Sequence, residues 1–238
     1  MKISVVTINY NNLIGLEKTV ECVLAQEGVI FEYIIVDGES SDGSDVFIRN
    51  VIDSEAARVS YLIEKDSGIS NAFNKAIDLC SGDFILMLNS GDVFFSKSTL
   101  KNIEPYLANE YDVVYGKVLT DDNFYLGESS AHVRADSIPH QGAFVANKAY
   151  EKYGFYDESL RIRMDYEIFS RFIASKAEIK MIDDVISIFE MGGVSSDHKN
   201  RGLFYREACF IDLKYKNIQV LGNFVRWVGH KVLQVCRT

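Results

Sequence analysis

The sequence predicts an α/β fold in which a mostly parallel, Rossmann-like sheet is flanked by helices. Short apolar runs alternate with helical patterns along the first half of the chain, which is the order that parallel sheets require. The 238 residues are 47% hydrophobic and 25% charged, the composition of a globular domain with a substantial core. We find no internal repeat, low-complexity tract or linker. The chain is therefore expected to form one α/β domain followed by a C-terminal helical extension.

The elements of the first half follow from hydrophobic periodicity. Leu16, Val20 and Leu24 recur at helical spacing, and a Ser-Ser-Asp-Gly turn at 40–43 caps the start of a second helix. Strands are expected over 3–8, 33–36, 59–63 and 84–88, and helices over 13–26, 44–52 and 69–79. This alternating order makes the four strands parallel.

The pattern weakens after residue 92. Strands are expected over 112–118, 124–126, 179–182 and 186–189, and helices over 148–153 and 166–174. These shorter and less regular segments predict a second half without the strict alternation of the first.

The charge of the chain is divided unevenly. The net charge is −9, but the residues from Arg201 onward carry seven basic and two acidic side chains, a net charge of +5. The first 200 residues therefore carry −14, which argues against nucleic acid as the main partner.

The cysteines and the apolar runs bear on the compartment. The four cysteines are scattered, without a CxxC pair or a histidine at ligand spacing, which argues against a zinc site and for a reducing compartment. The first residues lack the apolar stretch of a signal peptide, and no run of 18 apolar residues occurs. We expect a cytoplasmic protein.

Acidic residues follow two of the predicted strands. Asp92 comes just after the apolar run 84–88, where open α/β sheets bind ligands, and Gly91 leaves room for a bulky group. A carboxylate there suits a divalent cation that carries a diphosphate. Asp37 follows the strand at 33–36 and can accept hydrogen bonds from a ribose or a base imide. A solvated aspartate in a helix-capping loop is the alternative for Asp37.

Four segments carry a resemblance to a known family. They are 7–11 (TINYN), 36–44 (VDGESSDGS), 64–69 (EKDSGI) together with Asn74, and 88–92 (LNSGD). In this order and spacing they resemble the family 2 glycosyltransferases of GT-A fold, and most closely the branch of bacterial O-antigen, capsule and exopolysaccharide gene clusters. The resemblance covers residues 1–195, whereas the G-x-G-x-x-G loop of dinucleotide-binding domains is absent.

The resemblance implies a division of labour along the chain. Residues 1–200 would form the GT-A domain, with a nucleotide-sugar-binding half (1–92) and an acceptor half (93–200). Asp92 matches the last acid of the D-x-D signature and would ligate Mg²⁺ or Mn²⁺. The residues expected to bind the donor nucleotide are Thr7, Asn9, Tyr10, Asp37, Asp66, Asn74, Asn89, Ser90 and Gly91.

The D-x-D region departs from the fuller Asp-Ser-Asp-Asp form of the family, because Asn89 and Gly91 replace two acids. Fewer carboxylates lower the charge of the site, so the metal would depend heavily on diphosphate oxygens. Mg²⁺ commonly binds through one or two carboxylates plus substrate phosphates. For Asn89, a turn-forming role is the alternative to a ribose contact.

The family is expected to invert configuration in a single displacement, which needs a base on the acceptor side. Asp165, in the segment 162–167 (IRMDYE), matches the acid that opens the family's acceptor-side helix. Taken alone, an acid in a first helical turn is also explained by the helix dipole. Glu167 is the fallback for the base, Asp157 is expected to be structural, and Arg171 to pair with a neighbouring acid.

Two further segments could contact the substrates. His140 and Gln141 resemble the family's acceptor-side lining, and a structural histidine is the alternative. The glycine-containing loop at 192–196, followed by His198, Lys199 and Arg201, could close over the donor and meet its phosphates. An ordinary surface loop is the alternative there.

Residues 201–238 are expected to form a basic, amphipathic helical extension. Phe224, Val225 and neighbouring apolar residues recur at helical spacing, with Arg226 and Arg237 on another face. This pattern is typical of a helix at an anionic membrane surface, and a helix packed on its own domain or on a dimer partner is the alternative.

The expected function is thus transfer of a sugar from a nucleoside diphosphate sugar, UDP by the family's habit, to a glycan acceptor. Acceptors of such enzymes are commonly linked to undecaprenyl diphosphate, which gives a reason for a peripheral membrane contact. A nucleotidyltransferase would need a glycine-rich basic loop after the first strand, which the sequence lacks. A non-catalytic nucleotide-sugar-binding protein would keep Asp37 and Asp92 but have no use for Asp165.

Overall fold

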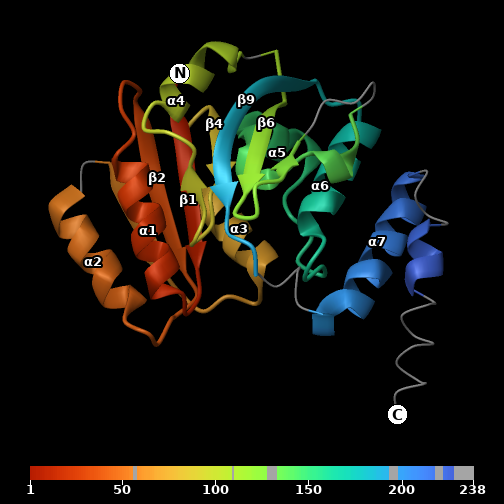
Figure 1. The fold of residues 1–238 in the computed structure, drawn as a ribbon, viewed down its shortest axis with the longest axis horizontal. Coiled ribbons are helices and arrows are strands. Elements are labelled where there is room, and N and C mark those ends of the chain that lie inside the picture. Colours follow the sequence, from red (N-terminus) through yellow and green to blue (C-terminus); the bar gives the residue numbers. More distant parts are fainter. Residues whose placement is uncertain (56–57, 109, 128–132, 193–197, 218–221, 228–238) are drawn as a thin grey trace.

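The computed structural model describes the chain except residues 56–57, 109, 128–132, 193–197, 218–221 and 228–238, and except the side chains of residues 54 and 198. A single sheet of nine strands runs through the molecule in the order β3-β2-β1-β4-β8-β6-β9-β5, with β7 paired to β6. Helices flank this sheet, and α7 lies at the side of the molecule beside α6 (Figure 1).

The first half forms the parallel part of the sheet, as the sequence predicts. Strand β1 pairs in parallel with β2 and β4, and β2 pairs with β3. The strands are β1 (Ile3–Asn9), β2 (Phe31–Asp37), β3 (Val59–Ile63) and β4 (Phe84–Met87), and the helices between them are α1 (Leu13–Leu24), α2 (Ser44–Glu55) and α3 (Ile69–Leu79). Because the strands are parallel, their polar carboxyl ends meet at one edge of the sheet, where Asn9 pairs with Asp37.

The second half adds strands that alternate in direction. Strand β8 is antiparallel to both β4 and β6, whereas β9 is parallel to β6 and antiparallel to β5. The strands are β5 (Val93–Phe94), β6 (Val113–Thr120), β7 (Tyr125–Leu126), β8 (Ala143–Ala146) and β9 (Ile179–Phe189). The helices are α4 (Thr99–Ile103), α5 (Asn147–Tyr153), α6 (Met164–Ala174) and α7 (Arg201–Tyr215), and 3₁₀ turns cover Glu104–Tyr106, Ala135–Ser137, His140–Gly142 and His198–Asn200.

The main correction to the predicted elements concerns β9, which is one strand of 11 residues and not two short ones. The predicted strands over 179–182 and 186–189 left residues 183–185, which include Asp183 and Asp184, as a break between them. The register of β6 and β9 instead shifts at this point, and the backbone of Asp184 lies so close to Gly116 that a side chain there would collide with it. A β-bulge thus keeps the strand continuous and leaves Asp183 exposed, where it pairs with Lys117.

Three short elements were not predicted, namely β5, α4 and β8. Each has at most five residues, too few for a periodic pattern to identify. Helix α1 also ends at Leu24, two residues before the predicted end.

Helix α7 is packed on the acceptor half. Helix α7 contacts α6. Its buried residues include Glu207 and Asp212, which are the two acidic residues of the 201–238 segment. The amphipathic pattern predicted beyond α7 falls largely on 218–221 and 228–238, outside the described residues. Within 222–227, which is helical, Phe224 and Val225 are exposed. Among the described helices, none has the length and apolar character needed to span a bilayer.

Candidate active site

Asp37 is held at the carboxyl end of β2 by a local hydrogen-bond network. Ser40 donates to it twice, from its backbone N–H and from its hydroxyl, both at 2.7 Å. Asn9, at the end of the neighbouring strand, donates its side-chain N–H to Asp37 at 2.7 Å. The side chains of Asp37 and Asn9 are buried, yet the Oδ1 atom of Asn9 has no partner among the described residues. An unpaired buried acceptor at this edge suggests a place for a ligand's donor group.

Tyr10 and Asp66 flank the turn that follows Asp37. A Cβ built on Gly38 would lie 2.6 Å from the Asp66 carboxylate and 3.1 Å from the Tyr10 ring, so only glycine fits between them. Tyr10 is 67% exposed, and its ring presents an open flat surface. Asp66 accepts the N–H of Gly68 at 3.0 Å. An exposed aromatic ring can stack on a nucleobase, and a neighbouring carboxylate can accept a hydrogen bond from the edge of that base.

Asp92 lies just past the end of β4 and is 3% exposed. Its Oδ1 accepts the backbone N–H of Glu190 at 3.1 Å, which ties the site to the end of β9. Burial raises the pKa of Asp92 to about 6, against the opposing charge of His140. Since none of the described cationic side chains forms an ion pair with this buried carboxylate, its burial is costly, and a bound cation would relieve that cost.

The segment that leads to Asp92 is fixed by backbone contacts. Ser90 donates both its N–H and its hydroxyl to the carbonyl of Ile8, and Gly91 donates its N–H to the hydroxyl of Thr19 at 2.9 Å. Gly91 has φ +105°, and its missing side chain leaves space beside Glu190. The Oδ1 atom of Asn89 is buried and has no partner in the part of the chain that the structure describes.

His140 connects the two halves of the site. Its Nε2 lies 3.2 Å from the side-chain nitrogen of Asn89, and its Nδ1 lies 3.8 Å from Oδ2 of Asp165. Asn89 follows β4 in the first half, whereas Asp165 begins α6 in the second half. One imidazole thus brings the D-x-D segment and the predicted base to a common site.

Asp165 lies in the first turn of α6 and its side chain is 33% exposed. Its Oδ1 accepts the backbone N–H of Tyr166 at 2.7 Å, which leaves Oδ2 facing His140. Burial acts to raise the pKa of Asp165, but the contact with His140 and the charge of Arg163 hold that pKa below its ordinary value. The carboxylate is therefore ionised at neutral pH, which is the state a general base requires.

Glu167, the fallback for the base, has a different role. Its side chain is 1% exposed and accepts from Arg171 at 2.7 Å, from Lys214 at 3.0 Å and from Tyr215 at 2.5 Å. These three partners occupy the buried Glu167 carboxylate, which argues against Glu167 as the base. The expected pairing of Arg171 with an acid is confirmed, and Asp157 accepts two hydrogen bonds from Ser159, as a turn-forming acid does.

Other predicted contacts lie elsewhere than expected. Thr7 is fully buried beneath the site and donates its hydroxyl to the carbonyl of Leu88. Asn74, expected to bind the donor nucleotide, uses its amide to hold the backbone of Tyr156 and the side chain of Glu158, so it ties α3 to the 154–158 turn. Gln141 is buried, and its backbone carbonyl accepts the hydroxyl of Ser187. The side chain of His198 lies outside the described residues, as does most of the loop at 192–196.

The residues present fit a divalent cation of a particular kind. Among the described residues, no group of three or more His, Cys, Asp or Glu could hold a metal ion. One carboxylate, Asp92, and one unpaired buried amide oxygen, on Asn89, are nevertheless at hand. This sparse oxygen set suits Mg²⁺ or Mn²⁺ bound mainly through the substrate's diphosphate, and does not suit a metal held by protein alone.

Two residues of the site were missed in the sequence. Ser40 stands three residues after Asp37, and the tendency of such residues to bond a preceding aspartate was a usable signal. Glu190 lies 98 positions from Asp92 and ion-pairs with Lys18 at 3.1 Å, and no local pattern could bring them together.

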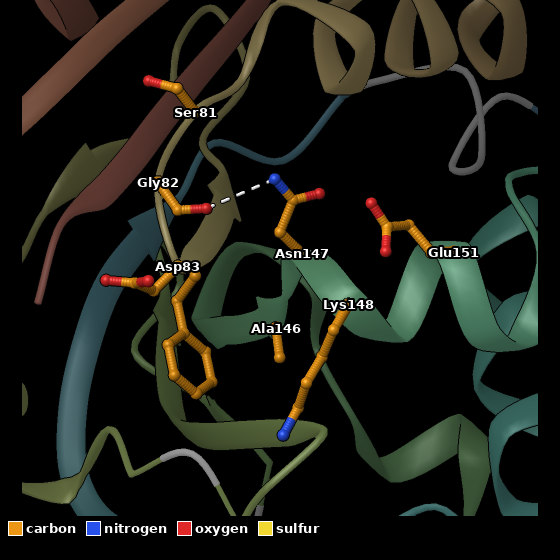
Figure 2. A pocket seen from close by; sticks show the side chains of 8 residues that line it. Ser81, Gly82, Asp83, Ala146, Asn147, Lys148 and Glu151 are labelled. Carbon is orange, nitrogen blue, oxygen red and sulfur yellow. Dashed lines mark hydrogen bonds between the residues drawn. The ribbon is translucent and has the colours of Figure 1, made fainter.

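A separate hollow of about 320 Å³ opens at the opposite edge of the sheet. Figure 2 shows that residues 81–83, before β4, line it together with the start of α5, where Asn147 donates to the carbonyl of Gly82. It contains none of the predicted site residues.

The comparisons with known proteins agree with this geometry. The family model of "Glycosyl transferase family 2" matches residues 4–161, about two thirds of the chain. The chain belongs to glycosyl transferase family 2. An uncharacterized glycosyltransferase of Mycobacterium tuberculosis is 29% identical over 216 residues, covering 85% of this chain and 80% of its own. A PGL/p-HBAD biosynthesis glycosyltransferase of Mycobacterium bovis is 26% identical over 178 residues, covering 70% and 68%.

Solved structures of low sequence identity show the same GT-A fold. The mannosyltransferase PcManGT of Pyrobaculum calidifontis, in complex with GDP-Man and Mn²⁺, superposes with a TM-score of 0.71 at 14% identity, covering 96% of this chain and 68% of its own. Residues 1–349 of Staphylococcus aureus TarS, in complex with UDP-GlcNAc, are 17% identical and give a TM-score of 0.70, with coverages of 97% and 71%. The resemblance of the motifs to this family and fold is thereby confirmed, whereas the O-antigen branch stays a prediction.

Proposed function

We propose that this glycosyltransferase inverts configuration as it transfers a sugar from a nucleoside diphosphate sugar, with UDP as the favoured nucleotide, to a hydroxyl group of a glycan acceptor. The observation that carries the proposal is the position of His140 between Asn89 and Asp165. It places the segment expected to bind the diphosphate next to the carboxylate expected to act as base.

The donor nucleotide would lie along the carboxyl ends of β1 and β2. Asp37 and the unpaired Oδ1 of Asn9 can bind hydroxyl or N–H groups of the nucleoside. The exposed ring of Tyr10 can stack on the base, while Asp66 accepts a hydrogen bond from its edge.

The metal would be held by Asp92, with Asn89 offering its free amide oxygen. When bound there, Mg²⁺ or Mn²⁺ would neutralise charge on the departing diphosphate. The complex of PcManGT, a protein of the same fold, with GDP-Man and Mn²⁺ supports the use of a divalent ion with the donor, and the complex of TarS with UDP-GlcNAc supports a nucleotide sugar as donor.

Asp165 would act on the acceptor. Its carboxylate removes the proton from the acceptor hydroxyl as that oxygen attacks the anomeric carbon of the sugar. The bond between the anomeric carbon and the diphosphate oxygen breaks at the same time, and the nucleoside diphosphate leaves with the electron pair. His140 would keep Oδ2 of Asp165 oriented toward the reacting oxygen.

We propose further that the acceptor is a lipid-linked glycan, such as one carried on undecaprenyl diphosphate at the inner face of the membrane, and that the product enters a surface polysaccharide such as O-antigen, lipopolysaccharide or exopolysaccharide. The net charge of +5 from residue 201 onward and the exposed Phe210, Leu213 and Phe224 support a peripheral membrane contact of a cytoplasmic enzyme. Deleting residues 218–238 should lower the membrane-bound fraction in cell extracts, and an unchanged fraction would contradict the membrane contact.

The experiment that tests the function screens UDP-, GDP- and dTDP-sugars for release of the nucleoside diphosphate, with Mg²⁺, Mn²⁺ or EDTA. We expect release from one nucleotide class only, dependent on a divalent ion. Absence of release with every donor would contradict the proposed reaction, and release unaffected by EDTA would remove the metal from Asp92.

A further inference from the structure

The carboxylate of Glu207, on α7, holds the backbone that leads into the candidate base. Its Oε1 accepts the N–H of Arg161, and its Oε2 accepts the N–H groups of Ile162 and Arg163, all at 3.0 Å. The residue is 5% exposed. Helix α6 begins at Met164, immediately after these three residues, and Asp165 is its second residue.

The Glu207 carboxylate is desolvated, and three backbone N–H groups converge on it. A buried carboxylate loses its hydration, and here backbone N–H groups replace the water. Three consecutive N–H groups converge on one side chain only if the segment keeps a single conformation. The contact therefore restrains the backbone at 161–163 more strongly than ordinary packing would.

A second residue of α7, Phe204, contacts the same segment through the side chain of Arg163. The guanidinium of Arg163 lies between the rings of Tyr166 and Phe204, at 4.3 Å and 4.5 Å from their centroids. Phe204 and Glu207 are three positions apart and share a face of α7. The helix thus holds both the backbone and a side chain just before Asp165.

Further along, α7 is anchored to the body of α6. Asp212 accepts the hydroxyl of Tyr166 at 2.5 Å and the side-chain nitrogen of Asn223 at 2.8 Å. The family-model match ends at residue 161, so α7 and the whole of α6 lie beyond it.

We propose that Glu207 is a positioning residue for sugar transfer, which fixes the 161–163 backbone and thereby the place of the Asp165 carboxylate relative to His140. The proposal rests on the function proposed for Asp165. Positioning matters because a misplacement of about 1 Å at the reacting groups can lower a rate by about 10²-fold. The nucleotide site proposed at the ends of β1 and β2 does not include residues 161–163, so Glu207 should influence the chemical step and not donor affinity.

The test substitutes Glu207→Gln, which keeps size and shape but turns an NH₂ group toward backbone N–H donors. Glu32→Gln is the matched control, because Glu32 also accepts backbone N–H groups, from Ser81 and Gly82, but at the opposite edge of the sheet. Both variants are compared with the wild-type chain in kcat, donor KM, affinity for UDP and amide hydrogen exchange over 160–166, well below their melting temperatures.

For Glu207→Gln we expect kcat to fall about 10- to 100-fold with donor KM and UDP affinity within about twofold of wild type, and faster exchange over 160–166. Glu32→Gln should leave all four unchanged. Should Glu207→Gln fail to fold, Phe204→Leu removes one ring from Arg163 and should show the same split with a smaller loss.

A folded Glu207→Gln protein with wild-type kcat, or one whose kcat and UDP affinity fall together, would overturn the positioning role. If the wild-type chain releases nucleotide from no donor, the proposed function has failed instead. In that case amide hydrogen exchange over 160–166 still tests whether Glu207 restrains the 161–163 backbone. Unchanged exchange in Glu207→Gln would overturn this restraint.

Discussion

The two edges of the parallel part of the sheet shift the pKa values of their buried acidic groups in opposite directions. At the amino ends of the strands, Glu32 is surrounded by donors, whereas at the carboxyl ends Asp92 is buried with few of them. The pKa of Glu32 is lowered to about 2, despite burial that raises it, because Lys2, Ser4 and Ser81 donate hydrogen bonds to it. The pKa of Asp92 is raised to about 6 by burial.

The unpaired atoms show the same contrast. Glu32 accepts at both oxygens, from the side chains of Lys2 and Ser4 and from Ser81 and Gly82. At the other edge, the Oδ1 atoms of Asn9 and Asn89 are buried and have no partners among the residues outside the undescribed segments. The hollow in Figure 2 nevertheless lies at the amino edge. In this comparison the unpaired amide oxygens of Asn9 and Asn89, and not the open volume, coincide with the candidate site.

The largest expected effect of a single substitution is at Asp165. Asp165→Asn removes the proton acceptor but keeps the shape of the side chain, so kcat for transfer should fall about 10³-fold while UDP affinity is unchanged. Transfer rates and calorimetric titration with UDP measure the two quantities. Asp157→Asn, in the nearby turn, is the control and should keep most activity. Wild-type turnover by Asp165→Asn would exclude this residue as base.

A smaller loss, about 10²-fold in turnover at fixed metal concentration, is expected for Asp92→Asn, since a charged ligand of the proposed cation is removed. Raising the concentration of Mn²⁺ should restore part of the rate. The measurement is a metal titration of UDP release by the variant and the wild-type chain. Superimposable titration curves would show that Asp92 does not hold the metal.

At the outer part of the site, Tyr10→Ala should weaken UDP binding about tenfold, because stacking of a base on an aromatic ring contributes about 1–3 kcal/mol. Tyr10→Phe keeps the ring and should bind as the wild-type chain does. Calorimetric titration distinguishes them. Equal affinities of the alanine and phenylalanine variants would remove Tyr10 from the base-binding surface.

The smallest effect on activity, none at neutral pH, is expected for Glu32→Gln, which should instead alter acid stability. The folded pKa of Glu32, about 2, lies below its ordinary value of 4.5. Its stabilisation is therefore present above pH 4.5 and is lost as the pH falls toward 2. The unfolding free energy of the wild-type chain should decrease over this interval by at most about 2 kcal/mol more than that of the variant. Parallel pH profiles in urea unfolding would contradict this assignment.

The parallel half of the fold was predictable because its strands and helices are long enough to show their periodicity. The positions of Asp37 and Asp92 near the carboxyl ends of β2 and β4 were predictable as well, because each acid ends or follows a buried apolar run, and their donor-side roles stay a prediction. The continuous β9 was not predictable, because the sequence pattern breaks at Asp183 and Asp184 and only the pairing with β6 shows the bulge.

The acceptor side depends on contacts between distant segments. The role of Asn74 in holding the 154–158 turn and the approach of Glu190 to Asp92 span 82 and 98 positions, respectively. Glu207 appeared in the sequence only as one acid in a basic tail. Its three backbone hydrogen bonds depend on how α7 packs against α6, which no local pattern encodes.

The central claim is that the carboxyl edge of the sheet, at Asp92, binds the metal and the diphosphate. The most direct measurement is the anomalous scattering of Mn²⁺ in crystals of the protein grown with UDP. The account predicts a manganese peak within coordinating distance of the Asp92 carboxylate, beside electron density for the diphosphate. Manganese and diphosphate bound in the hollow of Figure 2, or away from Asp92, would contradict it.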